Sequence, residues 1–209
     1  SAKAHQGQLR QSGEEFLSHP MEVAFNLTKL KMDELSVAVG LLHDTLEDTM
    51  ATAEEIKKQF GEEVYHLVEG VTKISKIEFA SREEKQAENF RKMIFAMAKD
   101  IRVVLIKLAD RVHNLKTLDS LPLDAQRRIA SETLDIFAPL ANRLGIGWIK
   151  TELENGCFKY LYPEEAKQIG EKLEKGEEKR ADFFQNVCEI LGGELEQARI
   201  SGLVVGRPK

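Results

Sequence analysis

The segment IRVVLIKLADRVHNLKTLDSL (101–121) constrains the fold more than any other part of the chain. Its apolar residues recur at helical spacing and cover most of the circumference of a helix, whereas a surface helix has one apolar stripe. Asp100 can cap the start of this helix, and Pro122 is expected to terminate it. The segment therefore predicts a central helix with neighbours on several sides.

The flanking segments supply such neighbours. The chain holds only 14 glycines and 5 prolines, too few turn formers for a sandwich or barrel of many short strands. Helical patterns cover 21–30, with Pro20 at the first helical position and His19 as N-cap, and the nearly all-apolar 33–44. Thr52 and Glu55 form a capping box for a helix that Gly61 closes, and another helix is predicted from 62 to about 71. These patterns predict an all-α helical bundle.

The remaining segments suggest how the chain continues. Residues 73–86 are charged and predict a mobile loop, with Ser81 capping a helix that runs towards Lys99. Helices are expected to continue to about Tyr162, and the β-branched 200–209 predicts a first strand of a further domain. Because the chain starts at Ser1 without a leader, we interpret it as a piece of a longer protein.

Charge, hydropathy and cysteine content exclude several classes of function. The 30 basic and 35 acidic residues give a net charge of −5, so direct DNA binding is not expected. The longest apolar runs fall far short of the roughly 20 residues that span a bilayer. Cys157 and Cys188 form no CxxC pair or disulfide framework, which favours the cytoplasm.

The motif HDTLED (43–48) carries the strongest chemical signal. If the helix continues through it, His43, Asp44, Glu47 and Asp48 crowd one helical end. Crowded carboxylates repel one another, and a divalent cation relieves that cost. The alternative is a solvated helix end, but acidic residues at a helix C-terminus oppose the helix dipole. The motif thus favours a metal site.

A polar stripe on the central helix supplies further groups. Its members are Lys107, Asp110, Asn114 and Thr117, at offsets of 0, 3, 7 and 10. The alternative is an ordinary solvent-facing edge. His113 lies off the stripe and is interpreted as a hydrogen-bonded structural histidine.

Asp110 can complete a metal site whose other ligands come from two different helices. The predicted ligands are His19, His43, Asp44 and Asp110. Two imidazoles and two carboxylates suit Mn²⁺, Fe²⁺ or Zn²⁺ better than Ca²⁺, and four ligands leave positions open for water and a substrate oxygen. Glu47 and Asp48 then remain as spare carboxylates that can activate water. The segment QLRQSGE (8–14) adds a guanidinium and a hydroxyl suited to a phosphorylated or planar ligand.

The order His19, His43-Asp44, Asp110 resembles that of the HD-domain metal phosphohydrolases. Longer matches resemble the hydrolase domain of Rel/SpoT-type proteins over roughly residues 5–165: RQSGEEFLSHP, LLHDTLEDT, FGEEVYHLVEGVTKISKI, QAENFRKMIFAMAKDIRVVLIKLADRVHNLKTL and ETLDIFAPLANRLGI. The resemblance implies Mn²⁺-dependent removal of the 3′ pyrophosphate from the alarmones ppGpp and pppGpp. It also implies an HD-domain bundle over 1–162, a helical linker over 163–199, and, from ISGLVVGRPK, the truncated start of an α/β synthetase domain over 200–209. The implied partners are that synthetase domain and the regulatory domains of a full-length protein.

The resemblance also implies roles for individual residues. It places the metal on the four predicted ligands and water activation on Glu47 and Asp48, in an intact HDxxED motif. The positions that match nucleotide contacts are Arg10, Gln11, Ser12, Asn114 and Thr117. Two departures occur: Gln11 stands where the family commonly has Lys, and Glu15-Phe16 replaces a frequent Pro-Tyr.

Two other functions remain open from the sequence. An HD phosphohydrolase could act on another nucleotide, because the metal cluster fixes hydrolysis and not the substrate. A regulatory module could bind alarmone without turnover and pass a signal to other domains.

Overall fold

The computed structural model describes residues 1–75, 99–174, 177–202 and 204. These residues form helices joined by loops and contain no β-strand beyond one isolated bridge, so the predicted all-α class is confirmed. The chain divides into two compact units, Ser1–Leu161 and Tyr162–Lys209. Each unit is described by itself.

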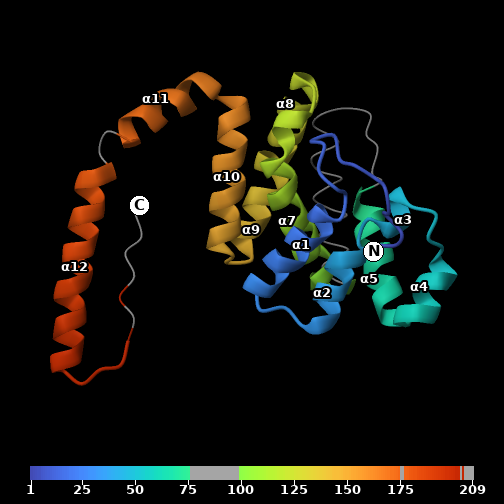
Figure 1. The fold of residues 1–209 in the computed structure, drawn as a ribbon, viewed down its shortest axis with the longest axis horizontal. Helices are drawn as coiled ribbons and strands as arrows, with labels where there is room; N and C mark the ends of the chain where they lie inside the picture. The colour runs from blue at the N-terminus through green and yellow to red at the C-terminus, as the bar shows by residue number, and fades with distance from the viewer. Residues whose placement is uncertain (76–98, 175–176, 203, 205–209) are drawn as a thin grey trace. The chain divides into compact units, whose positions relative to one another are not determined.

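Helix α7 (Ile101–Lys116) is the predicted central helix of the first unit (Figure 1). Asp100 caps it as expected, its side chain accepting a hydrogen bond from the backbone N–H of Arg102 at 2.9 Å. The predicted end near Leu121 is wrong, because the helix stops at Lys116 and a short 3₁₀ turn follows at Leu118–Ser120. That turn directs Leu118 into the core, where its side chain is 1% exposed.

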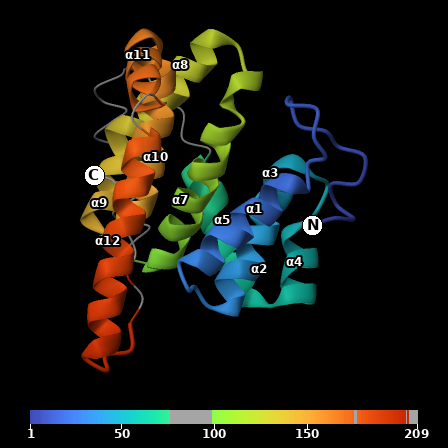
Figure 2. The ribbon, with the colours of Figure 1, turned by 60° about the vertical axis from the view of Figure 1, so that its left-hand side comes forward.

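The other helices of the first unit pack on both sides of α7. On one side lie α1 (Ser18–Lys29), α2 (Glu34–Leu42), α3 (Thr45–Asp48), α4 (Ala53–Phe60) and α5 (Glu62–Ser75). On the other lie α8 (Leu123–Glu132), a π-helical turn (Thr133–Phe137), α9 (Ala138–Arg143) and α10 (Gly147–Leu161). Figure 2 shows α7 between α1 and α2 on one side and α9 and α10 on the other.

Two hydrophobic clusters meet at α7. Val103, Ile106 and Ala109 belong to the cluster that α1, α2, α4 and α5 build, whereas Val104, Leu108 and Val112 belong to the cluster of α8 to α10. This division explains why apolar residues surround most of the helix. The buried polar residues of α7 are Lys107, Asp110 and His113.

The helices that lead to the motif at 43–48 are held by caps and close packing. Asp33 caps α2 by accepting from Ser36 N at 2.8 Å, and the predicted capping box of Thr52 and Glu55 is confirmed at the start of α4. Helices α1 and α2 approach so closely at Gly40 that a Cβ atom there would lie 2.6 Å from Leu27 Cδ1. Gly40 therefore permits the contact that fixes the end of α2 against α1.

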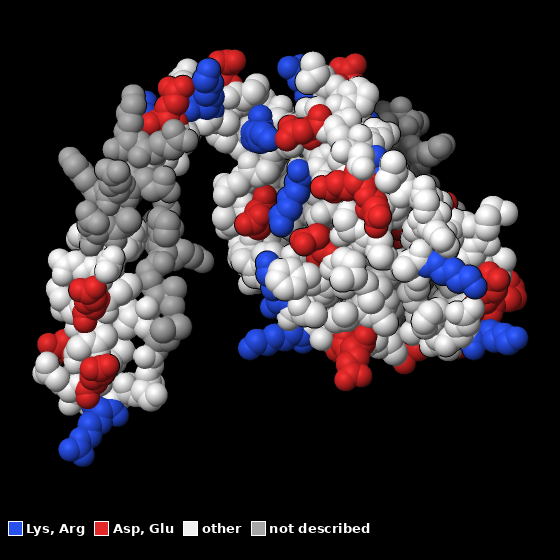
Figure 3. All heavy atoms as spheres, in the orientation of Figure 1, with Lys and Arg blue, Asp and Glu red and all other residues white. Residues whose placement is uncertain are grey.

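The helix predicted from 62 to about 71 extends to Ser75 as α5, so the predicted loop does not begin at 73. The remainder of that loop and the cap at Ser81 lie outside the described residues. Over the first unit, the face drawn in Figure 3 carries acidic and basic side chains interspersed.

The second unit contains α11 (Pro163–Glu174) and α12 (Glu177–Gln197). The strand predicted over 200–209 lies largely outside the described residues. Among the described helices, none combines the length and apolar composition required to cross a bilayer.

Candidate metal centre

His19 lies inside the first turn of α1. The prediction that it caps the helix is wrong, because α1 begins at Ser18 and Pro20 is its third residue. The first four N–H groups of a helix have no intrahelical acceptor, so a proline in the third position costs no hydrogen bond. His19 is 2% exposed, and its ring contacts His113 and Asp110 of α7.

His43 and Asp44 lie at a break between two helices. The predicted helix over 33–44 ends at Leu42, with His43 as its C-cap, and Asp44 precedes the short helix α3. The condition that one helix continues through the motif is therefore not met. After the break, His43 faces Asp110 of α7, and the Asp44 carboxylate lies beside His19 and His43.

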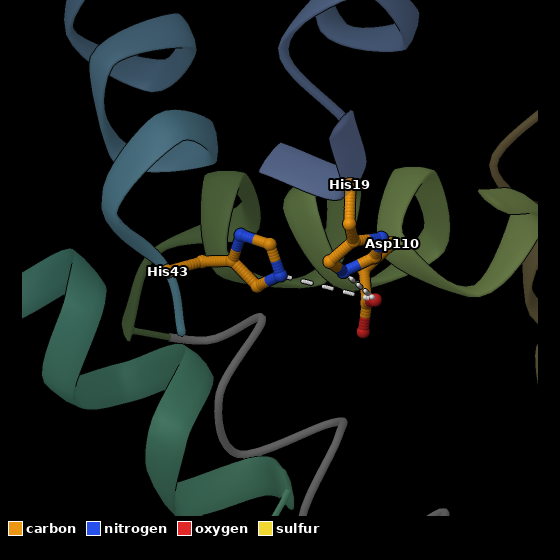
Figure 4. A group of neighbouring side chains, drawn as sticks. All are labelled: His19, His43 and Asp110. Atoms are coloured by element: carbon orange, nitrogen blue, oxygen red, sulfur yellow. Dashed lines mark ion pairs between the residues drawn. The ribbon is translucent and has the colours of Figure 1, made fainter. Parts of the chain in front are cut away.

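Four predicted ligands come together at this point. His19 Nε2 lies 3.2 Å from Asp110 Oδ1 and 3.3 Å from Asp44 Oδ2, and His43 Nε2 lies 3.0 Å from Asp44 Oδ1 and 3.8 Å from Asp110 Oδ1. Figure 4 shows His19, His43 and Asp110 converging from three separate segments. One ligand atom from each of these three lies within 4.8 Å of the other two.

The state of His43 fits a metal ligand. Its Nδ1 lies 2.8 Å from the carbonyl oxygen of Gly40, so Nδ1–H donates, and in the neutral ring that a metal ligand requires Nε2 carries the lone pair. His43 is fully buried, yet Nε2 has no hydrogen-bond partner and faces the two carboxylates. A buried nitrogen lone pair beside two carboxylate oxygens suits a divalent cation, which this cluster could hold.

Neighbouring charged groups shift the pKa values of Asp44, Asp110 and His19. Burial disfavours the charged forms, but Lys107 and the histidines hold the pKa of Asp110 well below its ordinary value, and His19 and His43 lower the pKa of Asp44. Burial also opposes protonation of His19, but Asp110 and Asp44 outweigh it and raise the His19 pKa. Both carboxylates are therefore ionised at neutral pH, as ligands must be.

The polar stripe on α7 is not a solvent-facing edge. Lys107 Nζ lies 2.6 Å from Asp110 Oδ2, and Asn114 Nδ2 donates to Asp110 Oδ1 at 2.6 Å. Lys107 and Asp110 are both buried. Three of the four stripe residues thus form one polar group centred on the carboxylate.

Arg10 joins this group from the N-terminal segment. Its Nη2 donates to Asn114 Oδ1 and to Thr117 Oγ1, both at 3.2 Å. A tight turn, in which Gly13 N donates to Arg10 O, places Gln11 and Ser12 at its exposed tip. No described contact joins either of these side chains to the cluster.

Glu47 and Asp48 lie on α3, directly after the break. Glu47 is half-buried and Asp48 is more exposed. Burial and the charge of Asp44 raise the pKa of Asp48. Gln8 Nε2 donates to the backbone carbonyl of Asp48 at 3.0 Å and so ties the N-terminal segment to α3.

Sequence reasoning gave His113 only a structural role. Its Nδ1 lies 2.7 Å from His19 Nδ1, and both side chains are buried. Burial, His19, Arg10 and Lys116 lower the pKa of His113 to about 4. His113 follows Asp110 by three residues and therefore lies on the same side of α7. This spacing in the sequence could have placed His113 near the site.

A comparison with protein-family models identifies residues 1–147 as an HD domain. The chain belongs to the HD-domain family. The predicted ligand order His, His-Asp, Asp is consistent with the name of that domain, and the predicted HD-type bundle is confirmed.

Curated relatives extend the similarity over the whole chain. The chain is 57% identical to a GTP pyrophosphokinase of Myxococcus xanthus and 50% identical to the bifunctional (p)ppGpp synthase/hydrolase SpoT of Escherichia coli (strain K12). These alignments cover 100% and 99% of this chain, but only 28% and 29% of the relatives. The resemblance to Rel/SpoT-type proteins is confirmed.

A solved structure of a metazoan SpoT ortholog, described as hydrolysing ppGpp and acting in starvation responses, has a similar fold. The TM-score is 0.58 at 28% identity, and the match covers 76% of this chain and 89% of that one.

Proposed function

We propose that this HD domain hydrolyses the 3′ pyrophosphate of ppGpp and pppGpp, releasing pyrophosphate and GDP or GTP. The observation that carries the proposal is that Asn114 bonds both Asp110 of the metal cluster and Arg10, a cation suited to phosphate. The names of the curated relatives and of the metazoan ortholog support the choice of substrate.

The proposed cofactor is Mn²⁺, held by His19, His43, Asp44 and Asp110. When bound, the ion lowers the pKa of a water ligand and offsets negative charge on a phosphoryl oxygen. Asp44 is the most open of the four, with 17% of its side chain exposed, so the cluster faces solvent on its side. We assign the substrate approach to that side.

The proposed water-activating residues are Glu47 and Asp48. A general base works best when its pKa is nearer the working pH than that of a free carboxylate, and the pKa of Asp48 is shifted in that direction. Asp48 then takes a proton from the attacking water. The half-buried Glu47, one residue earlier on α3, orients that water.

Arg10, Gln11, Ser12, Asn114 and Thr117 form the proposed nucleotide site. Arg10 is held in place by two oxygen acceptors on α7, and a guanidinium fixed in this way can bind phosphate without losing further side-chain freedom. Gln11 and Ser12, at the tip of the turn, are free to contact the nucleoside.

We further propose that the domain acts in the cytoplasm as the hydrolase part of a longer protein with synthetase and regulatory domains. The support is that the chain spans less than a third of the relatives it matches. In this arrangement residues 163–199 serve as the link and 200–209 begin the synthetase domain.

Pyrophosphate release from ppGpp by chelator-stripped protein, with and without Mn²⁺, tests the proposal. GTP and dATP serve as control substrates. We expect pyrophosphate to be released from ppGpp only when Mn²⁺ is present, and not to be released from GTP or dATP. Turnover of the controls alone would instead indicate a general nucleotide phosphohydrolase, and metal-dependent binding of ppGpp without turnover would indicate a regulatory module.

A further inference from the structure

His113 occupies a position that neither the motif nor the predicted ligand set includes. It follows Asp110 by three residues on α7 and is 6% exposed. Its ring centroid lies 4.9 Å from that of His19, and the two Nδ1 atoms are 2.7 Å apart. This distance requires a proton on one of the two nitrogens and a lone pair on the other.

The surroundings of His19 decide which nitrogen carries the proton. The opposite atom, Nε2, faces Asp44 and Asp110 at 3.3 and 3.2 Å. A neutral imidazole that offers the Nε2 lone pair to a metal must carry its proton on Nδ1. In that tautomer His19 Nδ1–H donates and His113 Nδ1 accepts.

His43 shows the same arrangement with a different acceptor. Its Nδ1–H donates to the backbone carbonyl of Gly40, and its Nε2 faces the cluster. Each histidine of the cluster is therefore held through Nδ1. For His43 the acceptor belongs to the main chain, whereas for His19 it is a side chain that substitution can remove.

We infer that His113 is a positioning residue that accepts the Nδ1 proton of His19 and so holds His19 Nε2 toward the bound metal ion. This inference rests on the proposed metal site. Because the carboxylate of Asp110 and the imidazole of His113 lie on one turn of α7, that turn supplies one ligand directly and orients a second.

The test compares three variants in Mn²⁺ titrations of chelator-stripped protein. His113→Leu fills similar space without an acceptor, and His113→Asn places an amide oxygen near the former Nδ1. His66→Asn, at an exposed position of α5, is the matched control. We expect His113→Leu to weaken Mn²⁺ binding about 10- to 100-fold, and the other two variants to stay within about threefold of the parent protein.

Thermal unfolding of each metal-free variant shows whether it folds. Parent-like Mn²⁺ affinity in folded His113→Leu would overturn the inference, as would an equal loss of affinity in folded His113→Asn. A second measurement needs no variant: in ¹⁵N-histidine-labelled protein loaded with Zn²⁺, we expect the proton of His19 on Nδ1 and that of His113 on Nε2. The opposite assignment would also overturn the inference.

Failure of the proposed ppGpp hydrolysis can be distinguished from failure of the inference about His113. If the parent protein binds Mn²⁺ but does not release pyrophosphate from ppGpp, the substrate proposal fails and the role of His113 at the metal stands. If the parent hydrolyses ppGpp and His113→Leu binds Mn²⁺ equally well, only the inference about His113 fails.

Discussion

Lys107 Nζ lies 2.6 Å from Asp110 Oδ2, on the side of the carboxylate opposite the histidines. One oxygen of Asp110 is therefore paired with an ammonium group, and Oδ1 is the oxygen that faces His19 and His43. Lys107 leaves Oδ1 as the oxygen without an ammonium partner and compensates the charge of Asp110, a residue that is only 2% exposed.

Replacing Lys107 by Met should destabilise the metal-free protein by about 3–5 kcal/mol, because the buried carboxylate of Asp110 loses its ammonium partner. Added Mn²⁺ should restore much of this stability, since both carboxylate oxygens then become available to the ion. Thermal unfolding with and without Mn²⁺ measures both effects. Lys150→Met, at a half-exposed pair with Glu154, is the control. An equal melting temperature for Lys107→Met and the control would contradict the role of the pair.

Asp48→Asn should leave the metal site intact and lower the turnover of ppGpp about 10²- to 10⁴-fold, because the amide cannot accept the proton of water. His43→Ala should instead lose the metal itself. Elemental analysis after dialysis separates the two variants. Unchanged turnover in Asp48→Asn would remove the water-activating role, and full metal content in His43→Ala would remove that residue from the ligand set.

Comparing Thr117→Val with Asn114→Leu should distinguish effects on ppGpp binding from effects on Mn²⁺ binding. The Thr117 hydroxyl accepts from Arg10 and donates to the Asn114 backbone carbonyl, and no described bond joins it to Asp110, so its loss should raise the KM for ppGpp about tenfold with Mn²⁺ affinity unchanged. Asn114 also bonds Asp110, so its loss should weaken both substrate and metal binding. Steady-state kinetics and Mn²⁺ titration measure these effects, and equal changes in both variants would exclude this division of roles.

Asp100 gives the fold a pH-dependent contribution. Its pair with Arg102 holds the pKa of Asp100 below the ordinary value of 3.8. The charged form therefore stabilises the protein above that pH, and the contribution disappears as the pH falls through the lowered folded-state pKa. Asp100→Asn keeps a capping oxygen but loses the charge, so its deficit relative to the parent should be present at pH 7 and shrink on acidification.

Asp100→Ala also loses the cap of α7 and should be less stable than Asp100→Asn by about 1 kcal/mol at every pH. Urea unfolding at pH 7 and at lower pH values tests both variants. A pH-independent deficit in Asp100→Asn would show that its charge does not contribute.

The two cysteines should differ in reactivity. Cys157 is fully buried in the cluster of α8 to α10, and burial raises the pKa of its thiol to about 12. Cys188 on α12 is partly exposed. Native protein should therefore react with one equivalent of a thiol reagent at pH 8, and a second equivalent should react only after unfolding. The Cys188→Ser variant should not react in the native state; rapid labelling of that variant would contradict the burial of Cys157.

The sequence was sufficient for features that depend on local periodicity and capping. The central helix, the Asp100 cap and the Thr52–Glu55 box follow from short-range rules and are present in the structure. The positions of His19 and His43 were predicted less well. Pro20 indicated that α1 begins at residue 20, whereas it begins at Ser18. The apolar residues before His43 gave no sign of the break after Leu42 that directs His43 toward α7.

The contacts of the site could not be predicted from spacing. The bonds from Arg10 to α7 join residues more than 100 positions apart, and the pair of His113 and His19 joins residues 94 positions apart. Such contacts follow from how α1 and the N-terminal segment pack on α7. Periodicity identifies the buried face of a helix but not its neighbour across the core.

The place of α7 between two hydrophobic clusters affects how mutational surveys of this protein should be interpreted. A substitution in the hydrophobic cluster between α7 and α10 can displace α7, the helix that carries Asp110 and His113. Such a substitution contacts no polar group of the site. Loss of activity alone therefore does not distinguish a damaged scaffold from damaged chemistry. Surveys that score survival need a parallel measure of protein abundance before a position is assigned to the reaction.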